Sequence, residues 1–202
     1  MSLPQLERYE IIEGTIYAKE SPSQTHQCVS SNLHRDIAGF LKGKSCKVFH
    51  APFDVCLNSE GDKGDTIVQP DLLVVSDKSK LDGIRCNGAP DLVIEILSPK
   101  TARMDKLTKF QKYLKAGVRE YWLVDLENRI LTVYVLENNK YYCNVYSDTD
   151  VVPVQVLNKC KINMKDIFAE GAVLKWKCPP MCWQGYSSSD RKTGLFALMS
   201  RY

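Results

Sequence analysis

Residues 90–97 read Pro-Asp-Leu-Val-Ile-Glu-Ile-Leu, and this stretch decides the fold. Apart from Glu95, the run from Leu92 is apolar and rich in β-branched residues, and Gly-Ala-Pro before it and Ser-Pro after it mark its ends. Such a run is typical of a central strand that is buried on both faces. We therefore expect a sheet at the core of the protein, with Glu95 inside it.

Glu95 is the strongest candidate for a functional residue, because it is the one ionisable side chain in this run. An unpaired ionised group costs several kcal/mol to bury. The carboxylate must therefore meet a cation or a hydrogen-bond donor, or it must be held protonated.

A second Pro-Asp pair opens another strand-like run, residues 69–75, with Asp71 at its start. Four residues of strand at about 3.3 Å each place Asp91 roughly 13 Å from Glu95, too far for both to bind one Mg²⁺ at about 2.1 Å. We interpret Asp91 as a turn residue after proline. Asp71 belongs to another strand and can lie beside Glu95, where two carboxylates ~4 Å apart repel by about 4 kcal/mol at a dielectric of 20. A divalent cation would relieve that repulsion, so we favour a ligand role for Asp71 over a simple turn role.

The composition is that of an ordinary globular protein. The chain has 202 residues, of which 44% are apolar and 25% charged, which supports one domain with a full-sized core. No apolar run is long enough to span a membrane and no secretory pattern is present, so we expect a cytoplasmic protein without membrane contact. The net charge of +3 permits nucleic-acid binding but does not argue for it.

The C-terminal residues break the pattern of the rest. Two prolines follow Cys178, and a Ser-Ser-Ser-Asp-Arg-Lys stretch comes later. We therefore divide the chain into a domain of residues 1–177 and a poorly packed appendage of residues 178–202. Cys178 and Cys182 are spaced like half of a zinc site, but without a second pair free thiols are the simpler interpretation.

Hydrophobic periodicity predicts a mixture of helices and strands. A short hairpin or a strand is expected over 9–17 with a turn at Glu13-Gly14, and helices over 25–41, capped by Ser23 or Thr25, and over 105–116, ended by Gly117. The second helix has Leu107, Phe110 and Leu114 on one face. Strands are expected over 48–57 and 66–75 as a hairpin, over the run that contains Glu95, and over 120–125, 130–136 and 141–146.

This order of elements resembles the core of the PD-(D/E)XK restriction-endonuclease-like nucleases. Residues 88–99, Asp105, Lys109, Tyr113 and residues 117–125 resemble the Uma-type branch of that superfamily, and the similarity spans about residues 9–176. The resemblance implies an α/β (α+β) fold, a restriction-endonuclease-like core in which helices flank a mixed central sheet. It also implies Mg²⁺-dependent hydrolysis of phosphodiester bonds in nucleic acid, with DNA the expected form and Mn²⁺ a substitute metal.

The resemblance assigns roles to particular residues. Asp71 matches the Pro-Asp acid and Glu95 the acid of the (Asp/Glu)-X-Lys motif, but Leu97 stands where the motif lysine is expected. Lys109 is the matching lysine in this branch. The alternative for Lys109 is an i,i+4 surface salt bridge with Asp105, worth only about 0.2–0.5 kcal/mol.

We expect Asp71, Glu95 and the backbone carbonyl of Ile96 to hold the metal, and Lys109 to orient or activate the attacking water. His26 lies on the inward stripe of the first helix, where it either lines the cleft or is a core histidine bonded to backbone.

Glu13 is a weaker candidate for completing the metal shell. Tyr113 and Tyr121-Trp122 are most simply core aromatics. The alternative function is a nuclease-like fold kept as a non-catalytic nucleic-acid-binding or interaction module, which the absence of the motif lysine favours. A homodimer is compatible with either function.

Overall fold

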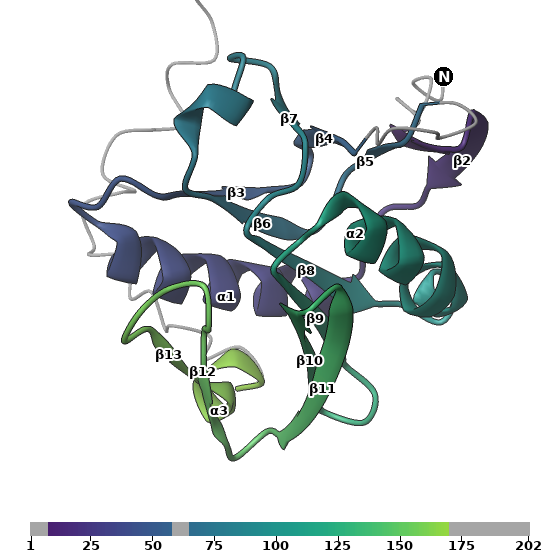
Figure 1. The fold of residues 1–202 in the computed structure, drawn as a ribbon. Helices are drawn as coiled ribbons and strands as arrows, with labels where there is room; N and C mark the ends of the chain where they lie inside the picture. The colour runs from purple at the N-terminus through teal and green to yellow at the C-terminus, as the bar shows by residue number, and fades with distance from the viewer. Residues whose placement is uncertain (1–7, 58–64, 170–202) are drawn as a thin grey trace, which may run out of the picture. The chain divides into compact units, whose positions relative to one another are not determined.

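The structure is a computed structural model that describes residues 8–57 and 65–169 (Figure 1). The proposed appendage of residues 178–202, with Cys178 and Cys182, lies outside the described residues. No helix among the described residues is long and apolar enough to cross a membrane.

The helices are α1 (Gln24–Leu41), α2 (Phe110–Ala116) and α3 (Met164–Ile167), with a short 3₁₀ helix at Lys78–Lys80 and a π-helix at Met104–Lys109. The strands are β1 (Arg8–Ile12), β2 (Thr15–Lys19), β3 (Lys47–His50), β4 (Asp54–Cys56), β5 (Ile67–Val68), β6 (Leu72–Val75), β7 (Arg85–Asn87), β8 (Leu92–Leu97), β9 (Glu120–Asp125), β10 (Ile130–Glu137), β11 (Lys140–Ser147), β12 (Val151–Pro153) and β13 (Lys161–Asn163).

The strand that contains Glu95 is central, as the sequence predicted. It is β8, which lies inside a six-stranded sheet of order β11-β10-β9-β8-β6-β3. It runs parallel to β9 and antiparallel to β6, and all its residues are buried. The sheet is therefore mixed, and the predicted α/β architecture with a mixed central sheet is confirmed.

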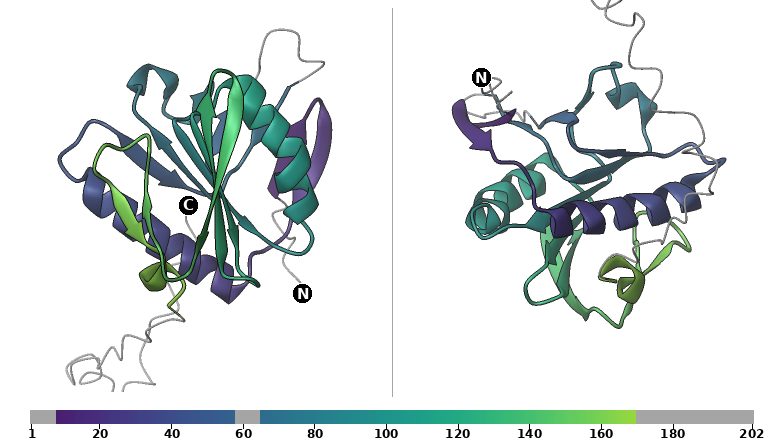
Figure 2. Two further views of the ribbon diagram at one scale, coloured as in Figure 1. Left: turned by 60° about the horizontal axis from the view of Figure 1, so that its bottom comes forward. Right: turned by 180° about the vertical axis from the view of Figure 1, so that it is seen from behind.

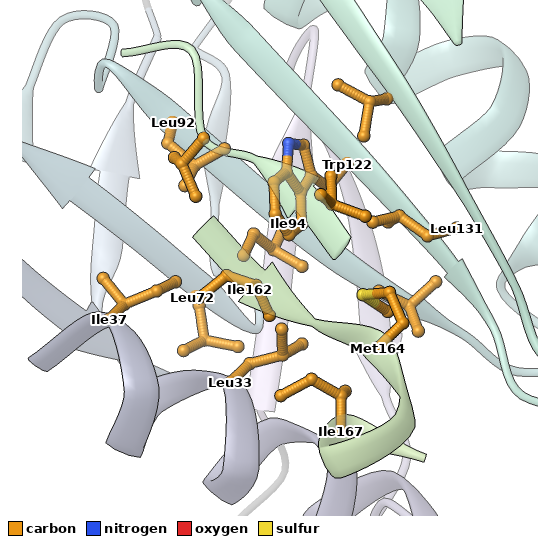
Figure 3. Close-up of a cluster of buried hydrophobic side chains, with 14 of the residues drawn as sticks. Leu33, Ile37, Leu72, Leu92, Ile94, Trp122, Leu131, Ile162, Met164 and Ile167 are labelled. Carbon is orange, nitrogen blue, oxygen red and sulfur yellow. The ribbon is translucent and has the colours of Figure 1, made fainter. Parts of the chain in front are cut away.

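Helix α1 covers one face of this sheet (Figure 2). Ser23, one of the two predicted caps, accepts a hydrogen bond from the backbone N–H of His26 and so begins the helix. Buried side chains from α1, the sheet, β13 and α3 meet in one apolar cluster (Figure 3). Its members include Leu33, Ile37, Leu72, Leu92, Ile94, Trp122, Leu131, Ile162, Met164 and Ile167.

The opposite face of the sheet is covered by α2 and by a second, five-stranded sheet of order β2-β1-β5-β4-β7. Side chains alternate along β8, so Val93 and Leu97 belong to the core on this face while Ile94 and Ile96 belong to the α1 face. Glu95 therefore points toward α2 and the second sheet.

The two long strands predicted over 48–57 and 66–75 are each broken in two. Pro52 and Pro70 stand at the breaks, where a residue without an N–H cannot continue a ladder. The predicted antiparallel pairing is nevertheless present, since β3 pairs with β6 and β4 with β5. The chain thus passes from the six-stranded sheet to a second sheet between β3 and β4, and it returns between β5 and β6. In the second sheet β5 also pairs with β1.

The predicted helix over 105–116 forms, but its first part is a π-helix. Gly117 ends it with a φ of 85°, which favours glycine. The predicted apolar face is wrong at Leu107, which is exposed. Asp105, Lys109 and Tyr113 point inward instead, because they face Glu95 across the interface with β8.

Candidate active site

Glu95 meets both a cation and a donor in the interior. Lys109 Nζ lies 3.0 Å from Glu95 Oε1, and the Tyr113 hydroxyl donates to the same oxygen at 2.7 Å. The side chains of Glu95 and Lys109 are each 3% exposed, so water screens this pair very little. The carboxylate thus has the partners that its burial requires, and Tyr113 is a site residue as well as a core aromatic.

Lys109 lies among three carboxylates. Its Nζ is 2.9 Å from Glu10, 3.0 Å from Glu95 and 3.2 Å from Asp105. The i,i+4 pair with Asp105 therefore exists, but the interpretation of it as a weak surface pair is wrong because both residues are buried. Removing one partner of a buried ion pair costs about 3–5 kcal/mol, far more than a surface pair contributes.

Glu10 is a member of this cluster that the sequence analysis missed. It lies on β1, is buried, and accepts hydrogen bonds from the backbone N–H of Gln69 at 2.8 Å and from Lys19 Nζ at 3.2 Å. The predicted hairpin contained a usable signal, because Glu10 is two residues from Ile12 and shares a face with it. A carboxylate on the apolar face of a strand needs a buried partner, just as Glu95 does.

Asp71 precedes β6 and lies at the same end of β8 as Glu95. Its Oδ2 accepts the backbone N–H of Ile96 at 2.7 Å, and His26 Nε2 lies 3.2 Å from the same oxygen. The structure thus brings His26 to the site, paired with a side chain rather than with backbone. The other ring nitrogen of His26, Nδ1, is buried and has no hydrogen-bond partner among the described residues.

Burial and nearby charges shift the pKa values of the ionisable residues in this region. Burial raises the pKa of Glu95 to about 8, and the charges of Asp105 and Asp71 add to this effect against the opposing charge of Lys109. Burial alone would lower the pKa of Lys109, but Glu95, Glu10 and Asp105 raise it well above its usual range. Lys109 is therefore a permanent cation, whereas Glu95 can carry a proton near neutral pH.

Glu13 is not brought to this cluster. It is in the turn between β1 and β2, its side chain is 53% exposed, and it pairs with Lys112 at 2.5 Å. Leu97 is buried in the apolar cluster that also contains Tyr113 of α2. The position where the motif lysine is expected is therefore occupied by a buried apolar side chain.

Ile96 uses its N–H to bind Asp71, and the N–H and C=O of one strand residue point to the same strand edge. The carbonyl of Ile96 therefore faces the side on which Asp71 lies.

The donor set on this side of β8 suits a hard cation. Contacts among the described residues use only Oε1 of Glu95 and Oδ2 of Asp71, which leaves the second oxygen of each carboxylate. Carboxylate and carbonyl oxygens are the ligands that Mg²⁺ prefers. In the described ranges no group of three or more His, Cys, Asp and Glu residues is arranged to hold a metal. The candidate ligands beside β8 are two carboxylates and one backbone carbonyl, which is fewer side chains than such a group contains. Their oxygens are of the type that Mg²⁺ prefers.

Residues 1–165 match the sequence pattern of a known family, Uma2, whose description is "Putative restriction endonuclease". The chain belongs to the Uma2 family. Its resemblance to the Uma-type branch is thereby confirmed, and the match includes every residue of the cluster described above.

Two individual proteins are similar to this Uma2 chain. An uncharacterized protein of Synechocystis sp., slr1290, is 26% identical over 132 residues, which are 64% of this chain and 67% of that protein. A crystal structure of a "putative nuclease belonging to DUF820" from Anabaena variabilis matches with a TM-score of 0.65 and 25% identity, over 79% of this chain and 89% of the other. Together with the family, this structural likeness supports a function of the nuclease type.

Proposed function

We propose that this Uma2 protein is a Mg²⁺-dependent nuclease that hydrolyses phosphodiester bonds in DNA. The observation that supports this most directly is the 3.0 Å contact between Lys109 Nζ and Glu95 Oε1. It joins an acid and a lysine from different elements, so the absence of a lysine at position 97 does not deprive the site of a cation. Asp71, on the neighbouring strand, supplies the second acid.

Asp71, Glu95 and the Ile96 carbonyl would hold Mg²⁺, which when bound would polarise the scissile phosphoryl group and favour ionisation of the attacking water. The raised pKa of Lys109 argues against its acting as a general base. Its role would be to donate hydrogen bonds and to stabilise negative charge that develops on the phosphoryl oxygens. Glu10 and Asp105 would fix the position of its ammonium group.

His26 would orient Asp71. Its Nε2 contact leaves the other Asp71 oxygen for the metal. Because His26 lies in the first turn of α1, this contact also links the Asp71 carboxylate to that helix. A His26→Gln variant would test this role through metal affinity, since a side chain that only packs in the core would leave affinity unchanged.

One observation favours the non-catalytic alternative. The Lys109 ammonium group is already in contact with three carboxylates, and it is almost inaccessible to solvent. A closed cluster of this kind also fits a nuclease-like fold that binds nucleic acid or a protein without cleaving it. In that case the cluster would only stabilise the fold.

Cleavage assays with matched variants separate the two functions. Supercoiled DNA, single-stranded DNA and RNA are incubated with the protein and Mg²⁺, Mn²⁺ or chelator, and metal binding is measured by calorimetry. We expect metal-dependent cleavage by the wild type and by Asp91→Asn, and none by Glu95→Gln. If the wild type binds metal but cuts none of these substrates, the non-catalytic alternative is correct.

A further inference from the structure

Strand β11 ends the six-stranded sheet, and its outer edge is open. No described strand pairs with that edge, and its 8 residues make it the longest such edge strand in the described ranges. Its side chains are mostly exposed, including Tyr142 and Val145 at 51% and 63%. Long unpaired edges of this kind are templates for adding another strand.

The turn before β11 determines which backbone groups point outward. Asn138 and Asn139 have φ values of 48° and 61°, which is the two-residue type I′ turn, and Glu137 pairs with Lys140 across it. The residues that flank such a turn bond to each other, so the N–H and C=O groups of Tyr141, Cys143 and Val145 point away from β10. Ser147, the next in this series, agrees with the assignment because its N–H binds the Asp150 carboxylate beyond the strand.

The other edge of the same sheet is protected, and β11 is not. Strand β3 has only 4 residues, contains Lys47 and His50, and is followed by Pro52. Short length, charge and proline are the features by which proteins block unwanted strand pairing. Residues 141–147 of β11 contain no charged residue and no proline, and the pairing of β11 with β10 continues without a bulge.

We propose that β11 pairs antiparallel with β11 of a second copy of this chain, so that the two six-stranded sheets join across a two-fold axis at Cys143. In this register Cys143 faces its own counterpart, and Tyr141 faces Val145 in both directions. Each outward group then has a partner, with two hydrogen bonds for each of the three pairs. A shift by two residues in one direction would use Ser147, whose N–H is already bonded to Asp150, and a shift in the other direction would place Val145 opposite Asn139 in the turn.

The charges on β11 favour a second copy as the occupant. In this register Lys140 lies opposite Tyr146, where an ammonium group can pack on an aromatic ring, and no like charges meet along the paired strands. Antiparallel pairing of identical strands also closes on itself, so the contact gives a dimer rather than a fibre.

Sedimentation of the full chain tests the interface with a matched pair of variants. The Val145→Pro substitution removes one outward N–H that no described residue uses, so it should leave the fold intact but weaken the dimer at least about tenfold. Val145→Thr keeps that N–H and should dimerise like the wild type. Circular dichroism and thermal melting of both variants establish that they are folded.

Cys143 reports the register directly. Paired residues in an antiparallel ladder have Cα atoms about 5.5 Å apart, within the range that a disulfide spans. Oxidation by copper phenanthroline should therefore yield a covalent dimer in which Cys143 is linked to Cys143 of the second copy, as identified by mass spectrometry, and Cys143→Ser should lack that linkage. A monomeric wild type up to about 1 mM, or a dimer that survives Val145→Pro, would overturn the proposal. Neither result bears on cleavage, because the interface is distinct from Glu95 and Lys109.

Discussion

The two Pro-Asp pairs have nearly the same backbone role and quite different surroundings. Asp71 accepts the N–H of Ile96 at 2.7 Å, and Asp91 accepts the N–H of Ser76 at 2.7 Å. Because β6 and β8 run antiparallel, each aspartate lies beside the end of the other strand. The dipeptide therefore provides the same strand-end contact twice.

The neighbours of the two carboxylates differ. The Asp91 carboxylate also binds the hydroxyl of Ser76 and, at 3.0 Å, the guanidinium of exposed Arg119. Asp71 has His26 in contact with it and Glu95 on the adjacent strand. A shared motif thus fixes backbone geometry, and the side chains that come from other elements decide which end can do chemistry.

Removing the buried cation at the Asp71 end should have the largest effect. We expect Lys109→Met to abolish cleavage and to lower the free energy of unfolding by about 3–5 kcal/mol, because Glu10, Glu95 and Asp105 would be left without their shared partner. Urea denaturation measures the stability, and exposed Lys106→Met is the control.

A stability change below about 0.5 kcal/mol in Lys109→Met would mean that the three carboxylates can be solvated without it. The double variant Lys109→Met/Glu95→Gln sharpens the result. It should recover part of the lost stability, since it removes one of the unpaired charges.

Replacing each of the two aspartates by asparagine in turn tests the comparison between the two Pro-Asp pairs. We expect Asp71→Asn to reduce cleavage and Mn²⁺ affinity at least ~100-fold, equivalent to about 2.7 kcal/mol. Asp91→Asn should leave both near the wild-type values, because asparagine can still accept the N–H of Ser76. Equal losses in the two variants would show that both ends serve only the fold.

The response to pH should also distinguish this end of the sheet. The pKa of Glu95 in the folded protein is about 8, above its ordinary value of 4.5, so the folded state keeps a proton that the unfolded state releases. Stability should therefore fall as the pH rises from about 5 to 8, by at most about 1.4 kcal/mol per pH unit from this group. Glu95→Gln should flatten the profile when unfolding is measured in chelator.

Asp71 and Asp91 should behave in the opposite sense. Both have a lowered pKa, because hydrogen bonds and nearby cations outweigh burial. Each therefore contributes stability that is lost only as the pH falls below the ordinary aspartate range. A wild-type profile that rises between pH 5 and 8 would contradict the assignment of a raised pKa to Glu95.

The smallest effect is expected at the Asp91 end. Arg119 is exposed, so Arg119→Met should cost less than about 1 kcal/mol and leave cleavage unchanged. The loss should shrink further in high salt, because exposed charges are screened. Denaturation at two salt concentrations provides the measurement, and a loss that does not depend on salt would argue for packing rather than charge.

Most of the fold could be predicted because its signals are local. The apolar run of β8, the glycine that ends α2 and the cap of α1 each depend on a few adjacent residues. The breaks at Pro52 and Pro70 were missed although each proline is visible. A proline indicates a weak point in a strand, but the sequence does not tell whether the chain there passes to another sheet.

The site was only partly predictable, because its members meet through tertiary packing. The burial of Glu95 required a partner, and its identity as Lys109 came from resemblance rather than from spacing. Glu10 lies 99 positions from Lys109, so no periodic pattern connects them. The inward face of the π-helix was hidden because it is polar, whereas sequence analysis looks for apolar faces.

The separate origins of the acid and the lysine bear on how such a site can evolve. Glu95 is fixed in the sheet, while Lys109 comes from the π-helix, and Leu97 occupies the position two residues beyond the acid. A lineage can thus acquire a lysine at one position before it loses the other, without an intermediate in which the carboxylate lacks a cation. The buried carboxylates would then be inherited together, while the lysine that pairs with them moved to another position in the sequence.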